Sequence, residues 1–195
     1  MTAAPAPPNR HEQISALAGG DAFRRRSALE ALGRLPKDAE TAALVLASLH
    51  DPSGYVVRTA AGIARRWGLA DAAPRLREVA GDPDPLTRRI SLEALRDLGS
   101  EADVELLMKV LSRDANRDVR NAAAWALAAV AGPSTWRRSF ELLVAGDVPR
   151  HRQLACELVR EFGDAADRET LRPLLSDHDG HVRKAAAQVL AEGEP

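Results

Sequence analysis

Apolar residues recur along most of the chain at helical spacing around a series of regularly placed arginines. Small or apolar residues fill the second to fourth positions after each arginine, and leucine or valine stands seven positions after most of them. Spacings of three, four and seven place these residues on one face of a helix. The arginines are Arg25, Arg58, Arg88, Arg120, Arg152 and Arg183. Their separations of 33, 30, 32, 32 and 31 residues indicate six repeats.

Each repeat is predicted to hold two helices, the second of which carries the arginine. The expected second helices cover 23–35, a segment ending at Gly68, 85–98, 117–131, 149–162 and 180–192. The expected first helices are one carrying Ile14 and Leu17, and 38–50, 71–80, 101–112, 134–145 and 167–176. The second repeat fits only with one residue deleted, which predicts that Trp67 belongs to the core.

A helical pair of about 31 residues has too little surface to bury its own apolar face, so neighbouring pairs must stack. This predicts an all-α fold, a right-handed α-solenoid of about six helical hairpins in one domain over residues 11–195. The repeats are expected at about 11–36, 37–69, 70–99, 100–132, 133–163 and 164–193. Residues 1–10 are expected to form a disordered tail, because Pro5, Pro7 and Pro8 prevent helix formation.

Composition narrows the function classes. The 195 residues are 45% hydrophobic and carry a formal charge of -1, which gives no bulk attraction to nucleic acid or to an anionic membrane. No apolar run approaches the roughly 18 residues of a membrane span, and the start lacks the features of a signal peptide, so we expect a cytoplasmic protein. The single cysteine, Cys156, takes a position filled by alanine in other repeats, which favours a buried structural thiol.

Most of the basic residues are arginines, many of them in adjacent pairs such as Arg65 and Arg66. A solvated face with intramolecular carboxylate partners explains these pairs, because one member of several pairs is already a repeat arginine. A track for phosphate groups is the alternative, and it would need the arginines on one face. Nucleic-acid binding is therefore kept as the third functional hypothesis.

An aspartate stands six residues before three of the repeat arginines, as in Asp114 and Arg120. Together with the alanine-rich positions that follow, this phrase resembles the HEAT repeat in its short bacterial form, which is also found in phycobilisome lyase subunits. The resemblance covers about residues 11–193. It implies an armadillo-type superhelix with the second helices on the concave face, and a ladder of aspartates and arginines linking adjacent repeats. The ladder residues would be Asp51, Arg58, Asp82, Arg88, Asp114, Arg120, Asp147, Arg152, Asp177 and Arg183. The first repeat departs from the pattern and is interpreted as a cap.

Trp125 stands out among the positions that should face solvent, because the corresponding residue is Glu or Gln in the other repeats that align without a gap. An apolar, tryptophan-bearing floor is a plausible docking site, since interfaces favour aromatic residues and arginine. The candidate partner-binding residues are Trp125, Asn121, Ala128, Ala129, Glu93, Glu157, Arg89, Arg96, Gln153 and Arg160. The flanking carboxylates favour a partner with an apolar anchor beside Arg or Lys. The alternative is that Trp136 or Pro133 covers Trp125 as part of the core.

Catalytic chemistry has little support in the sequence. His178 and His181 are weak candidates for a metal site, because their spacing coincides with a turn in which aspartate caps the following helix. Glu93 and Glu157 come from repeats two apart and should lie roughly 20 Å from one another, at about 10 Å per stacked repeat, too far for a catalytic carboxylate pair. No cofactor and no catalytic residue is assigned.

The sequence therefore favours a non-catalytic scaffold or adaptor that binds another protein on its concave face, as a monomer or weak homodimer. The alternative is a lyase- or chaperone-type subunit acting on a bilin-like or other small ligand, which rests on the resemblance alone.

Overall fold

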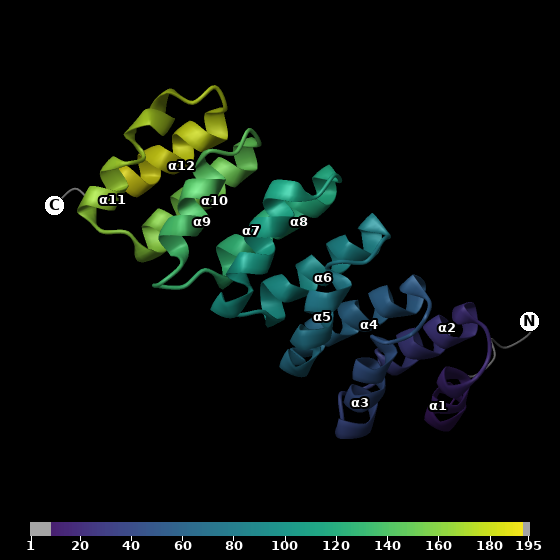
Figure 1. The fold of residues 1–195 in the computed structure, drawn as a ribbon. Coiled ribbons are helices and arrows are strands. Elements are labelled where there is room, and N and C mark those ends of the chain that lie inside the picture. Colours follow the sequence, from purple (N-terminus) through teal and green to yellow (C-terminus); the bar gives the residue numbers. More distant parts are fainter. Residues whose placement is uncertain (1–8, 193–195) are drawn as a thin grey trace, which may run out of the picture. The chain divides into compact units, whose positions relative to one another are not determined.

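The computed structural model describes residues 9–192, all of whose regular structure is helical (Figure 1). Twelve α-helices and three short 3-10 helices follow one another along this part of the chain. The chain divides into two compact units, residues 1–94 and 95–195, which are described separately below. The expectation of a disordered tail falls largely on residues outside the described range. Asn9 caps the first helix and Arg10 begins it, so the tail ends earlier than predicted.

Unit 1 contains two complete helical hairpins and most of a third. Its elements are α1 (Arg10–Ala18), α2 (Ala22–Leu32), α3 (Ala39–Ser48), α4 (Gly54–Trp67), a 3-10 turn (Ala70–Ala72), α5 (Ala73–Val79) and most of α6 (Pro85–Leu98). Helix α2 packs against α1 and α4, and α3 packs against α4. The side chain of Asp21 caps α2, because it accepts a hydrogen bond from the backbone N–H of Arg24 at 2.9 Å.

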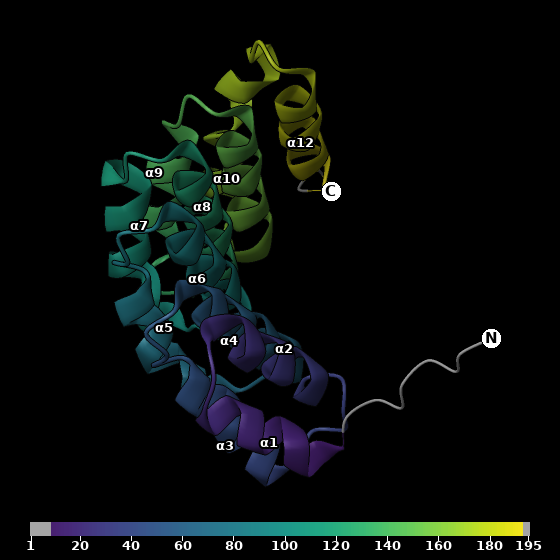
Figure 2. The ribbon, with the colours of Figure 1, turned by 90° about the vertical axis from the view of Figure 1, so that its right-hand side faces the viewer.

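Unit 2 repeats the same arrangement. Its elements are a 3-10 turn (Glu101–Asp103), α7 (Val104–Arg113), α8 (Arg117–Val130), α9 (Trp136–Val144), α10 (Pro149–Phe162), α11 (Ala165–Glu169), a second 3-10 turn (Arg172–Ser176) and α12 (Gly180–Ala191). Helix α10 contacts α8 on one side and α12 on the other, as can be followed in Figure 2, while α7 and α9 back α8 and α10. We call the surface formed by α8, α10 and α12 the second-helix face.

The predicted helices are present in the predicted order, and stacked helical hairpins of this kind are the architecture of an α-solenoid. Helices α6 and α10 have the predicted bounds. The segment predicted as one helix over 167–176 is instead divided between α11 and a 3-10 turn. Pro173 lies at the start of that turn and lacks the N–H that an uninterrupted α-helix would use.

The core of each unit consists of leucine, valine and alanine from the apolar faces of the helices. Leu29, Leu32 and Leu76 are fully buried in unit 1, and Leu127 and Leu143 are fully buried in unit 2. The prediction for Trp67 needs correction. Trp67 lies at the last position of α4 and is only half-buried, where it lines a surface depression with residues of α2 and α4.

Ion pairs between adjacent hairpins form part of the predicted ladder. Arg152 donates to both carboxylate oxygens of Asp177 at 2.7 and 2.9 Å, and Arg25 makes the same contact with Asp51. Arg58 pairs with Asp84 at 2.6 Å, whereas the predicted ladder aspartate was Asp82. Each of these three arginines therefore joins its own hairpin to the next one along the chain.

Asp147 does not occupy the ladder position that the sequence predicted for it. Arg152 donates to the backbone carbonyl of Gly146 at 2.7 Å, just as Arg120 donates to that of Asp114 and Arg183 to that of Asp177. Gly146 is therefore the structural equivalent of the turn aspartate, and Asp147 is one residue out of register. Glycine has no side chain, so this hairpin presents no carboxylate at that position.

Candidate functional site

A groove runs between α8 and α10 on the second-helix face, with a volume of about 560 Å³. Its floor is apolar, whereas its rim carries three arginines and two glutamates. We call it the Trp125 groove, and its lining residues are Arg96, Trp125, Ala128, Ala129, Ala131, Arg150, Leu154, Glu157, Leu158, Arg160, Glu161 and Phe162. Six of the ten predicted partner-binding residues lie together here. Sequence reasoning missed the remaining lining residues, nearly all of them on α10, because they are ordinary core or surface positions that become a wall only when α10 packs beside α8.

Trp125 lies open to solvent in this groove, with 40% of its surface exposed. Trp136 does not cover Trp125, contrary to the alternative considered from the sequence. Trp136 is 5% exposed and packs against Phe162 and Phe140, with ring centroids 6.4 Å apart in both cases. The two tryptophans therefore have different environments, one at the surface and one in the core.

Arg150 of α10 lies over the ring of Trp125, with its guanidinium carbon 4.5 Å from the ring centroid. A guanidinium at this distance is attracted by the negative face of the indole. The same side chain donates to Gln153 at 2.8 Å and lies 3.4 Å from a carboxylate oxygen of Glu157. Arg150 is therefore held between the aromatic ring and the polar ridge of α10.

The sequence suggested flanking carboxylates from Glu93 and Glu157. Glu157 lines the Trp125 groove and lies 3.4 Å from Arg150, whereas Glu93 is 3.5 Å from Arg89 and is not among the lining residues. Each of these glutamates therefore lies beside an arginine of its own helix, four residues away in the case of Glu93 and seven in the case of Glu157.

A second, smaller groove lies on the other side of α10, against α12, with a volume of about 320 Å³. We call it the α12 groove. It shares Arg150, Glu157 and Arg160 with the Trp125 groove, and α12 adds His181 and Lys184. Gln153, another predicted binding residue, lines this groove. The outer ridge of α10 is therefore flanked by depressions on both sides.

Asn121, predicted to contact a partner, is half-buried and is not among the lining residues of either groove. Its side-chain oxygen lies 3.2 Å from Nε2 of His151 on α10, so it links α8 to α10. His151 is 5% exposed. Burial lowers the pKa of His151, and the neighbouring Arg120, Arg117 and Arg152 lower it further, while Asp147 acts in the opposite sense.

This histidine predicts a pH dependence of stability. Since its folded-state pKa lies below the ordinary value of about 6.5, the unfolded chain binds a proton more readily than the folded chain. The free energy of unfolding should therefore decline as the pH falls below about 6.5. Urea titrations between about pH 7.5 and 5.5 should show this decline in the wild type and a weaker one in His151→Gln. His178→Gln, at an exposed position, serves as the control and should follow the wild type.

Cys156 is a buried residue of α10, with 1% of its surface exposed. Burial raises the pKa of its thiol to about 11, and Glu157 adds to the shift. A thiol in this environment is not a nucleophile at neutral pH. The geometry agrees with the structural role expected from the sequence.

His178 and His181, the weak metal candidates, do not converge. His178 lies beside Asp177 and Arg152, and the backbone N–H of His181 donates to the capping carboxylate of Asp179. Among residues 9–192, no group of three or more His, Cys, Asp or Glu side chains is arranged to hold a metal ion. The aspartate of this turn acts as a helix cap, as the turn interpretation predicted.

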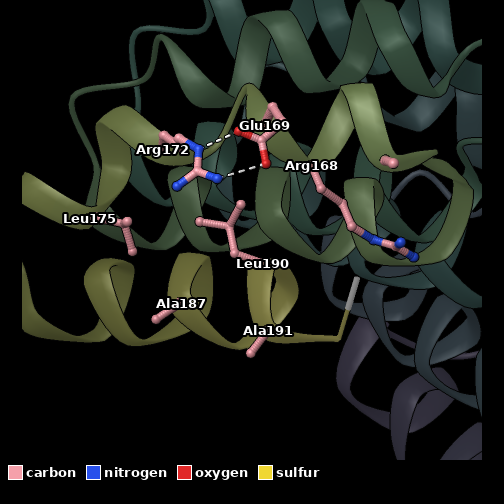
Figure 3. Close-up of a pocket in the computed structure, with 8 residues that line it drawn as sticks. Arg168, Glu169, Arg172, Leu175, Ala187, Leu190 and Ala191 are labelled. Atoms are coloured by element: carbon pink, nitrogen blue, oxygen red, sulfur yellow. Dashed lines mark hydrogen bonds and ion pairs between the residues drawn. The ribbon is translucent and has the colours of Figure 1, made fainter. Parts of the chain in front are cut away.

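A third depression, of about 310 Å³, lies at the C-terminal end of unit 2 between α11, the following 3-10 turn and α12 (Figure 3). Arg172 and Glu169 pair across its rim, and Leu175 and Leu190 form its apolar part. It contains none of the predicted binding residues.

Comparison with known proteins gives a match to a family model over part of the chain and a set of solved structures with a similar fold. Residues 46–128 match the family model described as HEAT repeats. No curated protein matches the chain. The described part of the chain contains no helix long and apolar enough to cross a membrane.

Similar solved structures include a chain of the complex of CpcE and CpcF of phycocyanin lyase from Nostoc sp. PCC7120, at 20% identity and a TM-score of 0.66, covering 97% of this chain and 79% of that one. A designed armadillo repeat protein, YIII(Dq)4CqI, has 16% identity and a TM-score of 0.65, covering 95% of this chain and all of the other. An engineered protein has 17% identity and a TM-score of 0.65, with coverage of 93% and 95%. At these identities the likeness shows the fold.

Proposed function

Taking HEAT repeats over residues 46–128 as the premise, we propose that the chain is a non-catalytic module that binds another protein through the second-helix face of unit 2. The observation that carries the proposal is Trp125. A large aromatic side chain that is 40% exposed lies in an apolar-floored groove beside Arg150. Tryptophan and arginine are the residues most enriched among those that dominate binding energy at protein interfaces.

The groove suits a peptide or helix better than a small molecule. Small-molecule sites enclose most of their ligand, and they use a few convergent polar groups to orient it. The Trp125 groove is instead a trough between two parallel helix surfaces, continuing around α10 into the α12 groove. Its helical walls are rigid elements, so little conformational entropy is lost when a partner binds.

The similarity to a phycocyanin lyase complex is the basis of the alternative, a subunit acting on a bilin-like ligand. That neighbour is a complex of two chains, which agrees equally with a protein-binding role for the fold. No residue of the grooves is placed for catalysis, so protein binding is the better supported proposal.

The test is capture of partners by the wild type and by Trp125→Ala from a lysate of the source organism. Removing a central aromatic anchor typically weakens binding by ~2 kcal/mol, which is roughly thirtyfold in affinity. We expect a protein that the wild type retains and Trp125→Ala loses. Phe23→Ala, which deletes another exposed aromatic ring on α2, is the matched control and should retain the same protein. A partner retained equally by the wild type, Trp125→Ala and Phe23→Ala would contradict the proposed site.

A further inference from the structure

We infer that the second-helix face selects an acidic peptide segment, one that places Asp or Glu beside an apolar side chain; this inference rests on the proposed function. The charge of the grooves is the first observation. The lining residues of the Trp125 and α12 grooves include four basic side chains, Arg96, Arg150, Arg160 and Lys184, against the two carboxylates of Glu157 and Glu161.

This basic surface contrasts with the rest of unit 2. Residues 95–195 contain 14 Lys and Arg and 17 Asp and Glu, so the unit as a whole is acidic. The grooves therefore carry net positive charge on a unit whose total charge is negative. Positively charged grooves favour partners that present negative charge at the interface, and they disfavour partners that present positive charge there.

The second observation is that two of these cations have no carboxylate of their own. Arg150 is engaged with Glu157, and Arg96 with Asp97 at 2.9 Å. Arg160 and Lys184 are exposed on α10 and α12, and within residues 9–192 neither forms an ion pair. A charged group from a partner is the counterion that the described surface lacks.

The third observation is how these cations lie relative to the apolar floor. Arg160 borders both grooves, and the alanines and leucines beside Trp125 form the floor of the first. A peptide that puts an apolar side chain against Trp125 would thus bring its neighbouring residues to Arg160, and those on the far side of α10 to Lys184.

The experiment is selection of random twelve-residue peptides displayed on phage, using the full-length chain as bait. We expect the enriched peptides to contain more Asp and Glu than Lys and Arg, together with a large apolar residue. Synthetic versions of the enriched peptides should then bind Arg160→Glu/Lys184→Glu on the order of tenfold more weakly at low salt, because two attractive charge contacts become repulsive. Raising the salt should narrow that difference.

Lys109→Glu/Arg113→Glu is the matched control. It makes the same change of net charge with two exposed side chains of α7, outside both grooves, and should bind like the wild type. Equal loss in both double variants would show a general charge effect and overturn the inference.

The outcomes separate the two proposals. Peptides that depend on Trp125 but are neutral or basic would overturn the acidic preference and leave the protein-binding proposal standing. An absence of enriched peptides, or peptides unaffected by Trp125→Ala, would overturn both. Tight, salt-sensitive binding of a single-stranded oligodeoxynucleotide that is lost in Arg160→Glu/Lys184→Glu would assign the cations to phosphate groups instead.

Discussion

Replacing Arg152 with alanine is expected to lower the free energy of unfolding by about 3–5 kcal/mol, a large effect for a single arginine. Arg152 and Asp177 are among the most buried charges in the described structure, with side chains 8% and 7% exposed, and they share two hydrogen bonds. Alanine at position 152 would leave the Asp177 carboxylate buried without its cation. It would also remove the donor to the carbonyl of Gly146.

The same pair predicts a change in acid stability. Arg152 lowers the pKa of Asp177 to about 2, so the stability that this carboxylate contributes is present above its ordinary pKa of about 3.8 and is lost as the pH falls toward 2. Arg152→Ala should reduce this part of the acid dependence. Urea titrations followed by far-ultraviolet circular dichroism at neutral and acid pH would measure both effects.

Arg26→Ala is the matched control for this prediction. Arg26 pairs with Glu30 on the same helix, but the two side chains are 44% and 37% exposed, and exposed pairs of this kind contribute less than about 1 kcal/mol. A similar loss in the free energy of unfolding in the two variants would show that the Arg152–Asp177 link between hairpins stabilises the fold no more than an exposed ion pair does.

The sequence was sufficient to predict the helices and their order, because each hairpin must bury an apolar face whose period is visible in the residues themselves. Its predictions failed where one residue shifts the register. Asp147 looks like a turn aspartate, yet the backbone places Gly146 in that position, and only the hydrogen bond from Arg152 shows it. Trp67 likewise follows the core period but lies where the helix ends.

The candidate site was predictable in part for a related reason. The unusual character of Trp125 is evident from comparing repeats, and the structure places it in a groove with Ala128 and Ala129. The position of Arg150 over the indole was not predictable, because it depends on how two adjacent hairpins stack and on the direction of a long side chain. Arg150, which the sequence analysis did not include among the candidate binding residues, therefore became part of the site only in the structure.

Trp136→Ala is expected to destabilise unit 2 by about 3–5 kcal/mol, whereas Trp125→Ala should cost far less. Trp136 is 5% exposed, stacks on Phe162 at an interplanar angle of 21°, and is covered on another side by Arg137 at 4.5 Å. Truncation would open a cavity at the junction of α9 and the end of α10. The ring of Trp125 instead faces solvent, so its loss removes mainly the contact with Arg150.

Urea titrations of the two variants, followed by far-ultraviolet circular dichroism, measure the difference in stability directly. Binding of a partner or peptide by the same variants measures the difference in docking. A core role and a docking role make opposite predictions for the same pair of residues. Trp136→Ala should lose stability, and whatever remains folded should still bind, while Trp125→Ala should remain stable and lose binding. If Trp125→Ala is the less stable of the two, the ring is part of the core in solution, and the groove would lose its anchor along with the argument for docking there.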